Sequence, residues 1–121
     1  MEKKILVVED DADARDLLAL LLRREGYAVD TASDGREALK HIKLDCPDLI
    51  ITDINMPHLN GVELIKLVRQ LPECNDLPII VMTAYGSGKA SDALEAGADH
   101  ALKKPLEYDS FIVGINELLA T

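Results

Sequence analysis

Five short apolar segments alternate with five segments of helical periodicity along the chain, and this alternation constrains the fold more than any other feature. A strict strand–helix alternation predicts a parallel sheet that is covered by helices on both faces. The predicted strands are 4–8, 27–32, 48–53, 78–84 and 100–104. The predicted helices are 12–25, 89–96, 108–119 and two further stretches that begin with capping signals. Asp34 with Glu37 marks the start of one of these stretches, and Asn60 with Glu63 marks the start of the other.

The number of strands narrows the topology further. Five strands are too few for a closed barrel of eight, and right-handed crossovers leave an open sheet. We therefore predict an α/β fold with a doubly wound, five-stranded parallel sheet in the order 2-1-3-4-5, which is a flavodoxin-like arrangement. Residues 1–121 contain no linker and no repeat, so we expect them to form one domain.

Charge and hydropathy exclude several classes of protein. The formal net charge is −9, which disfavours direct binding to the phosphate backbone of a nucleic acid. No apolar run reaches the length of about 18 residues that a membrane span needs, and the acidic N-terminal segment is not a signal peptide. We expect a cytoplasmic protein without a membrane partner.

The two cysteines, Cys46 and Cys74, have no metal-binding spacing. We expect free thiols in a reducing compartment. Each cysteine precedes a strand, and these strands are neighbours in the predicted sheet, so the pair is expected to be close enough to bridge under oxidation.

Polar side chains gather where the predicted strands end. The carboxyl ends of parallel strands meet at one edge of the sheet, and ligands bind there at the switch point of the winding, here between the first and third strands. Asp53 is a poor residue for a half-buried strand end unless its charge is needed. The polar residues at this edge are Glu9, Asp10 and Asp11 after the first strand, Asp53 and Asn55 at the third, Thr83 at the fourth, and Lys104 at the fifth.

This set of side chains fits the chemistry of phosphoryl transfer. Three carboxylates in one crevice repel each other unless a cation joins them, and hard oxygen ligands suit Mg²⁺. The Lys104 ammonium and the Thr83 hydroxyl are suited to phosphoryl oxygens, and carboxylates such as Asp53 can act as nucleophiles that form aspartyl phosphates. Singly, each residue has an ordinary role, such as Asp53 in a turn, but their common position favours a site.

Four segments resemble the receiver domain of bacterial response regulators, of the single-domain type, and the resemblance covers essentially the whole chain. They are "ILVVEDD", "DLIITDINMPHLNGVEL", "PIIVMTA" and "LKKP". The resemblance implies that Asp53 is the phosphoacceptor and that Glu9 and Asp10 are the acidic pair, with Asp10 the more direct metal ligand. It also implies that Asn55 offers its backbone carbonyl to Mg²⁺, that Thr83 and Lys104 hold the phosphoryl group, and that Asp11 caps a helix.

The resemblance also implies partners for the chain. The phosphoryl donor would be a histidine kinase or a histidine phosphotransfer protein. The output would be the surface formed by the fourth helix, fifth strand and fifth helix, which would bind a downstream effector protein or domain. The alanine-rich fourth helix has only a weak apolar anchor, mainly Leu94 with Ala90 and Ala93, which suits a mobile element. The chain would not be an enzyme beyond its own Mg²⁺-dependent phosphorylation and dephosphorylation. A stand-alone regulator, a relay intermediate and a part of a longer regulator all remain open.

One position departs from the family pattern. Receiver domains usually have an aromatic residue three positions before the lysine that precedes the proline, and here that residue is Ala101. The neighbouring His100 should point to the other face of the strand. Tyr85, two residues after Thr83, lies in a loop that could contribute instead.

Two other classes of protein use a similar fold. An aspartate-nucleophile phosphatase would use the same ion, but it normally needs a second acid two residues after the nucleophile, where this chain has Asn55, and a cap over its substrate. A flavin-binding module would need a loop rich in Gly, Ser or Thr after the first strand, where this chain has acids.

Overall fold

The computed structural model describes residues 2–84 and 89–120, and its centre is a single parallel sheet. The five strands pair in the order β2-β1-β3-β4-β5, as the sequence predicts, and every pair is parallel. The predicted strands agree with the observed ones to within one residue at each end. The strands are β1 (Lys4–Val8), β2 (Ala28–Ala32), β3 (Leu49–Asp53), β4 (Ile79–Thr83) and β5 (His100–Lys103).

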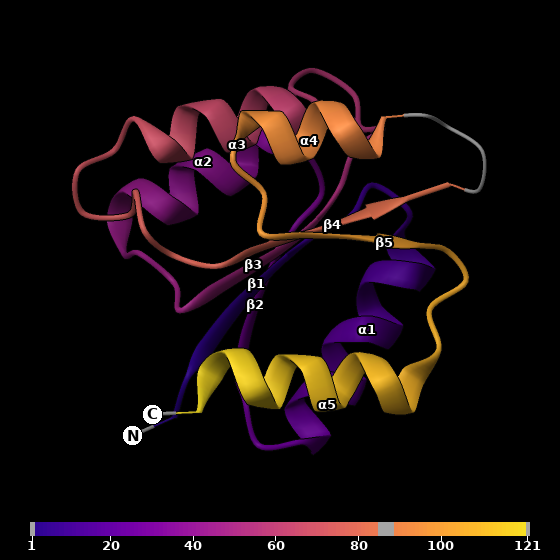
Figure 1. Ribbon diagram of the computed structural model, residues 1–121. Helices are drawn as coiled ribbons and strands as arrows, with labels where there is room; N and C mark the ends of the chain where they lie inside the picture. The colour runs from indigo at the N-terminus through magenta and orange to yellow at the C-terminus, as the bar shows by residue number, and fades with distance from the viewer. Residues whose placement is uncertain (1, 85–88, 121) are drawn as a thin grey trace.

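In the part of the chain that the structure describes, five helices cover the two faces of this sheet (Figure 1). Helices α2, α3 and α4 lie on one face, and α1 and α5 lie on the other. Within the described part of the chain, none of them is long and apolar enough to cross a membrane. The helices are α1 (Ala12–Arg24), α2 (Gly35–Leu44), α3 (Gly61–Arg69), α4 (Ala90–Ala96) and α5 (Tyr108–Leu119).

Side-chain caps begin the helices that follow the first three strands. The Asp11 carboxylate accepts a hydrogen bond from the Ala14 amide at 3.2 Å, which confirms its expected role as a cap. Asn60 and Glu63 form a complete capping box, in which each side chain accepts from the other residue's amide. These caps fix the points at which the chain turns from the sheet edge into a helix.

The core is divided by the sheet into two clusters of buried side chains. Every residue of the central strands β3 and β4 is buried, which is typical of parallel strands with both faces covered. One cluster packs against α2, α3 and α4, and the other packs against α1 and α5. The rigid centre of the sheet therefore carries Asp53 and Thr83 at its carboxyl edge.

The expectation that Leu94 is the main anchor of α4 is wrong, whereas Ala93, which was expected to contribute, is buried. The Leu94 side chain is 46% exposed, whereas Ala93 is fully buried at 0% exposure. A helix of seven residues presents little of its surface to the sheet, and the residue at the point of contact here is a small one. Helix α4 consequently packs on the core through small side chains: Ala93 is buried, and the partly buried Ala96 packs against the same cluster.

The two cysteines do not remain free thiols, so that expectation is also wrong. Cys46 and Cys74 are joined in a disulfide, with their Cα atoms 5.8 Å apart. The expected proximity of the two residues is confirmed. The disulfide links the segment before β3 to the segment before β4, at the edge of the sheet opposite the polar cluster.

Candidate metal and phosphoryl site

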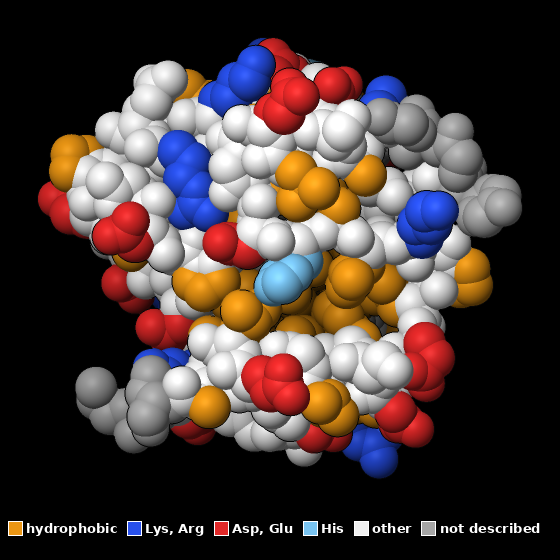
Figure 2. Space-filling view, viewed as in Figure 1, with side chains coloured by type: hydrophobic (Ala, Val, Ile, Leu, Met, Phe, Trp, Pro, Cys, Tyr) orange, Lys and Arg blue, Asp and Glu red, His pale blue; other side chains and the backbone are white. Residues whose placement is uncertain are grey.

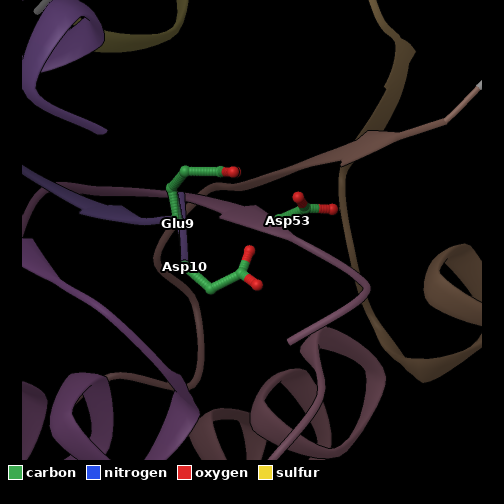
Figure 3. Close-up of side chains that lie close together, drawn as sticks. All are labelled: Glu9, Asp10 and Asp53. Carbon is green, nitrogen blue, oxygen red and sulfur yellow. The ribbon is translucent and has the colours of Figure 1, made fainter. Parts of the chain in front are cut away.

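Three carboxylates meet at the carboxyl ends of β1 and β3 (Figure 3). The two strands pair with Val8 opposite Thr52, so Glu9 and Asp10 arrive beside Asp53. One carboxylate oxygen from each of the three residues lies within 4.8 Å of the other two. Glu9 and Asp53 are buried, and Asp10 is exposed. The cluster predicted from the sequence is thus present, and solvent reaches it on the side of the exposed Asp10.

Lys104, which directly follows the edge strand β5, also contacts this cluster. Its Nζ atom lies 2.8 Å from Asp53 Oδ2 and 3.4 Å from Glu9 Oε2. Its backbone amide donates to the Thr83 carbonyl at 2.8 Å, which fixes it just past the end of β5. Burial lowers the pKa of Lys104, but the Asp53 and Glu9 carboxylates raise it more, so the net pKa lies above its ordinary value. Lys104 is therefore a fixed positive charge next to Asp53.

The site opposes the ionisation of the Glu9 carboxyl group. Burial, and then the adjacent Asp53 carboxylate, raise the pKa of Glu9 from 4.5 to about 7, although Lys104 opposes this effect. One ammonium therefore does not balance the local negative charge. A second cation at this position would relieve the repulsion.

The donor atoms suit a hard divalent cation. The three groups offer carboxylate oxygens, which are the ligands that such ions prefer. The backbone amide of Asn55 donates to Asp53 Oδ1 at 3.3 Å, so the backbone turns tightly around the Asp53 carboxylate. The residues present therefore fit an ion of this class. The expected role of the Asn55 carbonyl as a ligand stays a prediction.

Thr83 lies at the end of β4 beside the cluster. Asp53 is opposite Met82 in the β3–β4 pairing, so Thr83 is the next residue along the neighbouring strand. Its side chain is buried at 3% exposure. The structure thus places the hydroxyl-bearing residue at the same edge of the sheet, as the sequence predicts.

Two contributors to the site were missed in the sequence. Gly61 follows Asn60 at the start of α3, and a Cβ atom at this position would lie 2.5 Å from the Asp53 carbonyl oxygen. Lys89, just before α4, donates to Asn55 Oδ1 at 2.6 Å. The signal for Gly61 was a glycine directly after a cap residue, and that for Lys89 was a basic residue soon after the end of β4.

The position that departs from the family pattern lies on the outermost strand. Ala101 is half-buried and carries no aromatic ring, and the neighbouring His100 is exposed. His100 and Leu102 line a groove of about 510 Å³ against α5, and Figure 2 shows hydrophobic side chains on the floor between α4 and α5. Tyr85, the suggested substitute, lies outside the described residues.

Comparison with known sequences identifies relatives over nearly the whole chain. Residues 5–116 match the response regulator receiver domain. The response regulator MprA of Mycolicibacterium vanbaalenii is 42% identical over 120 residues. The alignment covers 98% of this chain and 51% of that protein, so the chain spans about half the length of this relative.

Solved structures agree with this relationship. A putative response regulator from Chloroflexus aurantiacus J-10-fl superimposes with a TM-score of 0.93 at 37% identity, with both chains covered completely. The chemotaxis response regulator CheY4 of Vibrio cholerae gives a TM-score of 0.90 at 30% identity, covering 98% of this chain and 100% of that one. The chain belongs to the response regulator receiver domain family.

Proposed function

We propose that Asp53 accepts a phosphoryl group in a Mg²⁺-dependent reaction, and that residues 1–121 form one phosphoacceptor domain. The observation that supports this most strongly is the environment of Asp53. Its carboxylate is buried, lies 2.8 Å from the Lys104 ammonium, and shares a cluster with Glu9 and Asp10. A nucleophile, a cation site and a fixed positive charge are thus available around one oxygen pair.

The chain's own residues supply most of the chemistry. Glu9, Asp10, Asp53 and the Asn55 carbonyl would hold the ion, which neutralises charge on the carboxylates and on the incoming phosphoryl group. An Asp53 oxygen forms the new P–O bond while the P–N bond of a phosphohistidine donor breaks, and the released imidazole takes up a proton. Lys104 and Thr83 would hold the transferred phosphoryl oxygens.

The partners in this proposal are those of a two-component pathway. The donor is a histidine kinase or a histidine phosphotransfer protein, and the reaction is placed in the cytoplasm. Phosphorylation adds charge at the sheet edge and shifts a population between two conformations. The surface formed by α4, β5 and α5, which includes the groove along β5, would then bind a downstream effector protein or domain.

The domain's own chemistry is limited in this proposal to gaining and losing that phosphoryl group. A phosphatase would need an acid at position 55, whereas the Asn55 side chain is an amide whose oxygen accepts from Lys89. A flavin phosphate would meet the acidic Glu9–Asp10 segment. The phosphoacceptor role is therefore the one that the side chains support.

Intact mass measurement after incubation with acetyl phosphate and Mg²⁺ tests the proposal. Wild-type protein should gain one phosphoryl group, and Asp53→Asn should gain none while its circular dichroism stays unchanged. Asp76→Asn is the matched control, because Asp76 is exposed and lies at the opposite edge of the sheet.

The role of the metal is tested with the Asp10→Asn variant and, separately, with a chelator. Either change should slow labelling of the wild-type site strongly, because the carboxylates then lack their shared cation. Labelling of Asp53→Asn at the wild-type rate would contradict the assignment of Asp53, and labelling that is indifferent to Mg²⁺ would contradict the metal role.

A further inference from the structure

Lys89 connects the start of α4 to the phosphoacceptor loop. Its Nζ atom donates to Asn55 Oδ1 at 2.6 Å, across 34 residues of sequence. The backbone amide of the same Asn55 donates to Asp53 Oδ1 at 3.3 Å. One residue, Asn55, thus lies between the Lys89 ammonium and the Asp53 carboxylate. Figure 1 shows that α4 begins on the side of the molecule where β4 ends.

The charges around this contact favour a phosphoryl oxygen as a partner for Lys89. The site holds Glu9, Asp10 and Asp53, and Lys104 contacts two of them at 2.8 and 3.4 Å. Replacing the Asp53 carboxylate by an acyl phosphate adds a further negative charge and new acceptor oxygens. An amide oxygen such as Asn55 Oδ1 is neutral, whereas a phosphoryl oxygen carries negative charge and attracts the Lys89 ammonium more strongly.

We propose that Lys89 is a second phosphoryl-positioning residue, which is held by Asn55 before phosphorylation and exchanges that contact for a phosphoryl oxygen afterwards. This inference rests on the proposed phosphoacceptor role of Asp53. The exchange breaks one hydrogen bond and forms another, with no proton transferred. The flexible four-carbon stem of lysine permits the change of partner without moving β3.

The place of Lys89 in the fold gives this exchange a consequence. Lys89 occupies the N-cap position of α4, and its side chain makes no capping hydrogen bond to the helix. The only fully buried residue of α4 is Ala93. A change of partner at Lys89 therefore acts directly on the first turn of α4, a helix that buries little of its surface in the core.

A purely structural role would make Lys89 an exposed residue with a hydrogen bond of small value. The two roles differ in what they predict for the phosphorylated state. A structural contact affects both states equally, whereas a positioning residue changes the affinity for a phosphoryl mimic.

The experiment measures the affinity for beryllofluoride in saturating Mg²⁺ and the lifetime of the phosphoryl group. Lys89→Met removes the charge and keeps most of the stem, and Lys89→Arg restores the charge. Lys66→Met is the matched control, since Lys66 is an exposed lysine on α3 that lines the same groove between α3 and α4 as Lys89.

We expect Lys89→Met to bind beryllofluoride about tenfold more weakly, which is the loss of one modest charged contact. Lys89→Arg should stay within about threefold of wild type and Lys66→Met within about twofold, on the same scale. Amide chemical shifts of α4 should respond less to the mimic in Lys89→Met than in wild type. The melting temperature without the mimic should be the same for all four proteins.

Two results would overturn the inference alone. One is a Lys89→Met protein that binds the mimic as wild type does, and the other is a Lys89→Arg protein that fails as fully as Lys89→Met. A wild-type protein that neither gains a phosphoryl group nor binds beryllofluoride would instead overturn the proposed function, and this inference with it.

Discussion

Helices α3 and α4 flank the same site on the same face of the sheet, yet the chain holds them very differently. Helix α3 begins with a complete capping box and buries four of its residues: Gly61, Leu64, Ile65 and Val68. Helix α4 has no side-chain cap and buries only Ala93. In the proposed function, α3 is therefore the helix that positions Asp53, and α4 is the helix that responds to its phosphorylation.

The far end of α4 is nevertheless fixed, and α3 supplies the group that fixes it. The Arg69 guanidinium donates to the Gly97 carbonyl from Nε at 3.1 Å and from Nη2 at 2.7 Å. It also donates to the Leu77 carbonyl at 2.7 Å and pairs with Asp99 at 3.1 Å. Helix α4 is thus hydrogen-bonded to Arg69 of α3 at its C-terminus. At its N-terminus it is hydrogen-bonded to Asn55 in the site, through Lys89.

Truncation of one leucine in each helix should give the largest contrast. Leu64→Ala removes a side chain that is 1% exposed and should lower the free energy of unfolding by about 3 kcal/mol. Leu94→Ala removes a side chain that is 46% exposed and should cost less than about 1 kcal/mol. Urea denaturation measures both values. Equal losses would mean that α4 is anchored as firmly as α3.

Glu9, just after the end of β1, carries a carboxyl group whose ionisation the folded protein opposes. The pKa of Glu9 is raised from 4.5 when unfolded to about 7 when folded, so its contribution to stability is complete below pH 4.5 and is lost as the pH rises through 7. The metal-free protein should lose roughly 2–3 kcal/mol over this range.

Glu9→Gln should remove this pH dependence, and saturating Mg²⁺ should reduce it in the wild-type protein because a cation offsets the repulsion. Thermal denaturation at several pH values is the measurement. A wild-type protein that becomes more stable between pH 5 and pH 8 without metal would show that Glu9 is not strained.

A glycine substitution tests how tightly α3 packs against Asp53. A Cβ atom at position 61 would lie 2.5 Å from the Asp53 carbonyl oxygen and 2.8 Å from Ile54 Cα. Both are backbone atoms, so Gly61→Ala should displace Asp53, lower the free energy of unfolding by about 2 kcal/mol and slow phosphorylation.

The control for that substitution is Gly114→Ala in α5, where nothing lies within 4 Å of the added carbon. Alanine should be neutral or stabilising there, because it favours a helix. Normal stability and labelling in Gly61→Ala would show that the approach of α3 to Asp53 is not tight.

The sequence predicts the strand order and most of the site because both follow from local pattern. Each strand reads as an apolar run with a polar residue at its carboxyl end, and the parallel topology then brings Glu9, Asp10, Asp53 and Lys104 together. The Asn60–Glu63 capping box is likewise visible as a spacing of three residues.

The contacts that depend on packing were not visible in the sequence. Leu94 is the larger apolar side chain, but the helix axis decides that Ala93 faces the core. The proximity of Cys46 and Cys74 follows from the strand order, but their bond was not expected. The reach of Lys89 to Asn55 joins segments far apart in sequence, and no periodicity encodes such a distance. The same holds for the position of Arg69 against the turn after α4.

Amide chemical shifts recorded with and without beryllofluoride, in Mg²⁺, test most directly whether a phosphoryl group on Asp53 acts on α4 while α3 stays in place. Asp53→Asn serves as the control and should show no response to the mimic. If α4 responds and α3 does not, the changes should be large along residues 89–97 and small along residues 64–69. Changes that are as large in 64–69 as in 89–97, or that are absent from 89–97, would contradict this expectation.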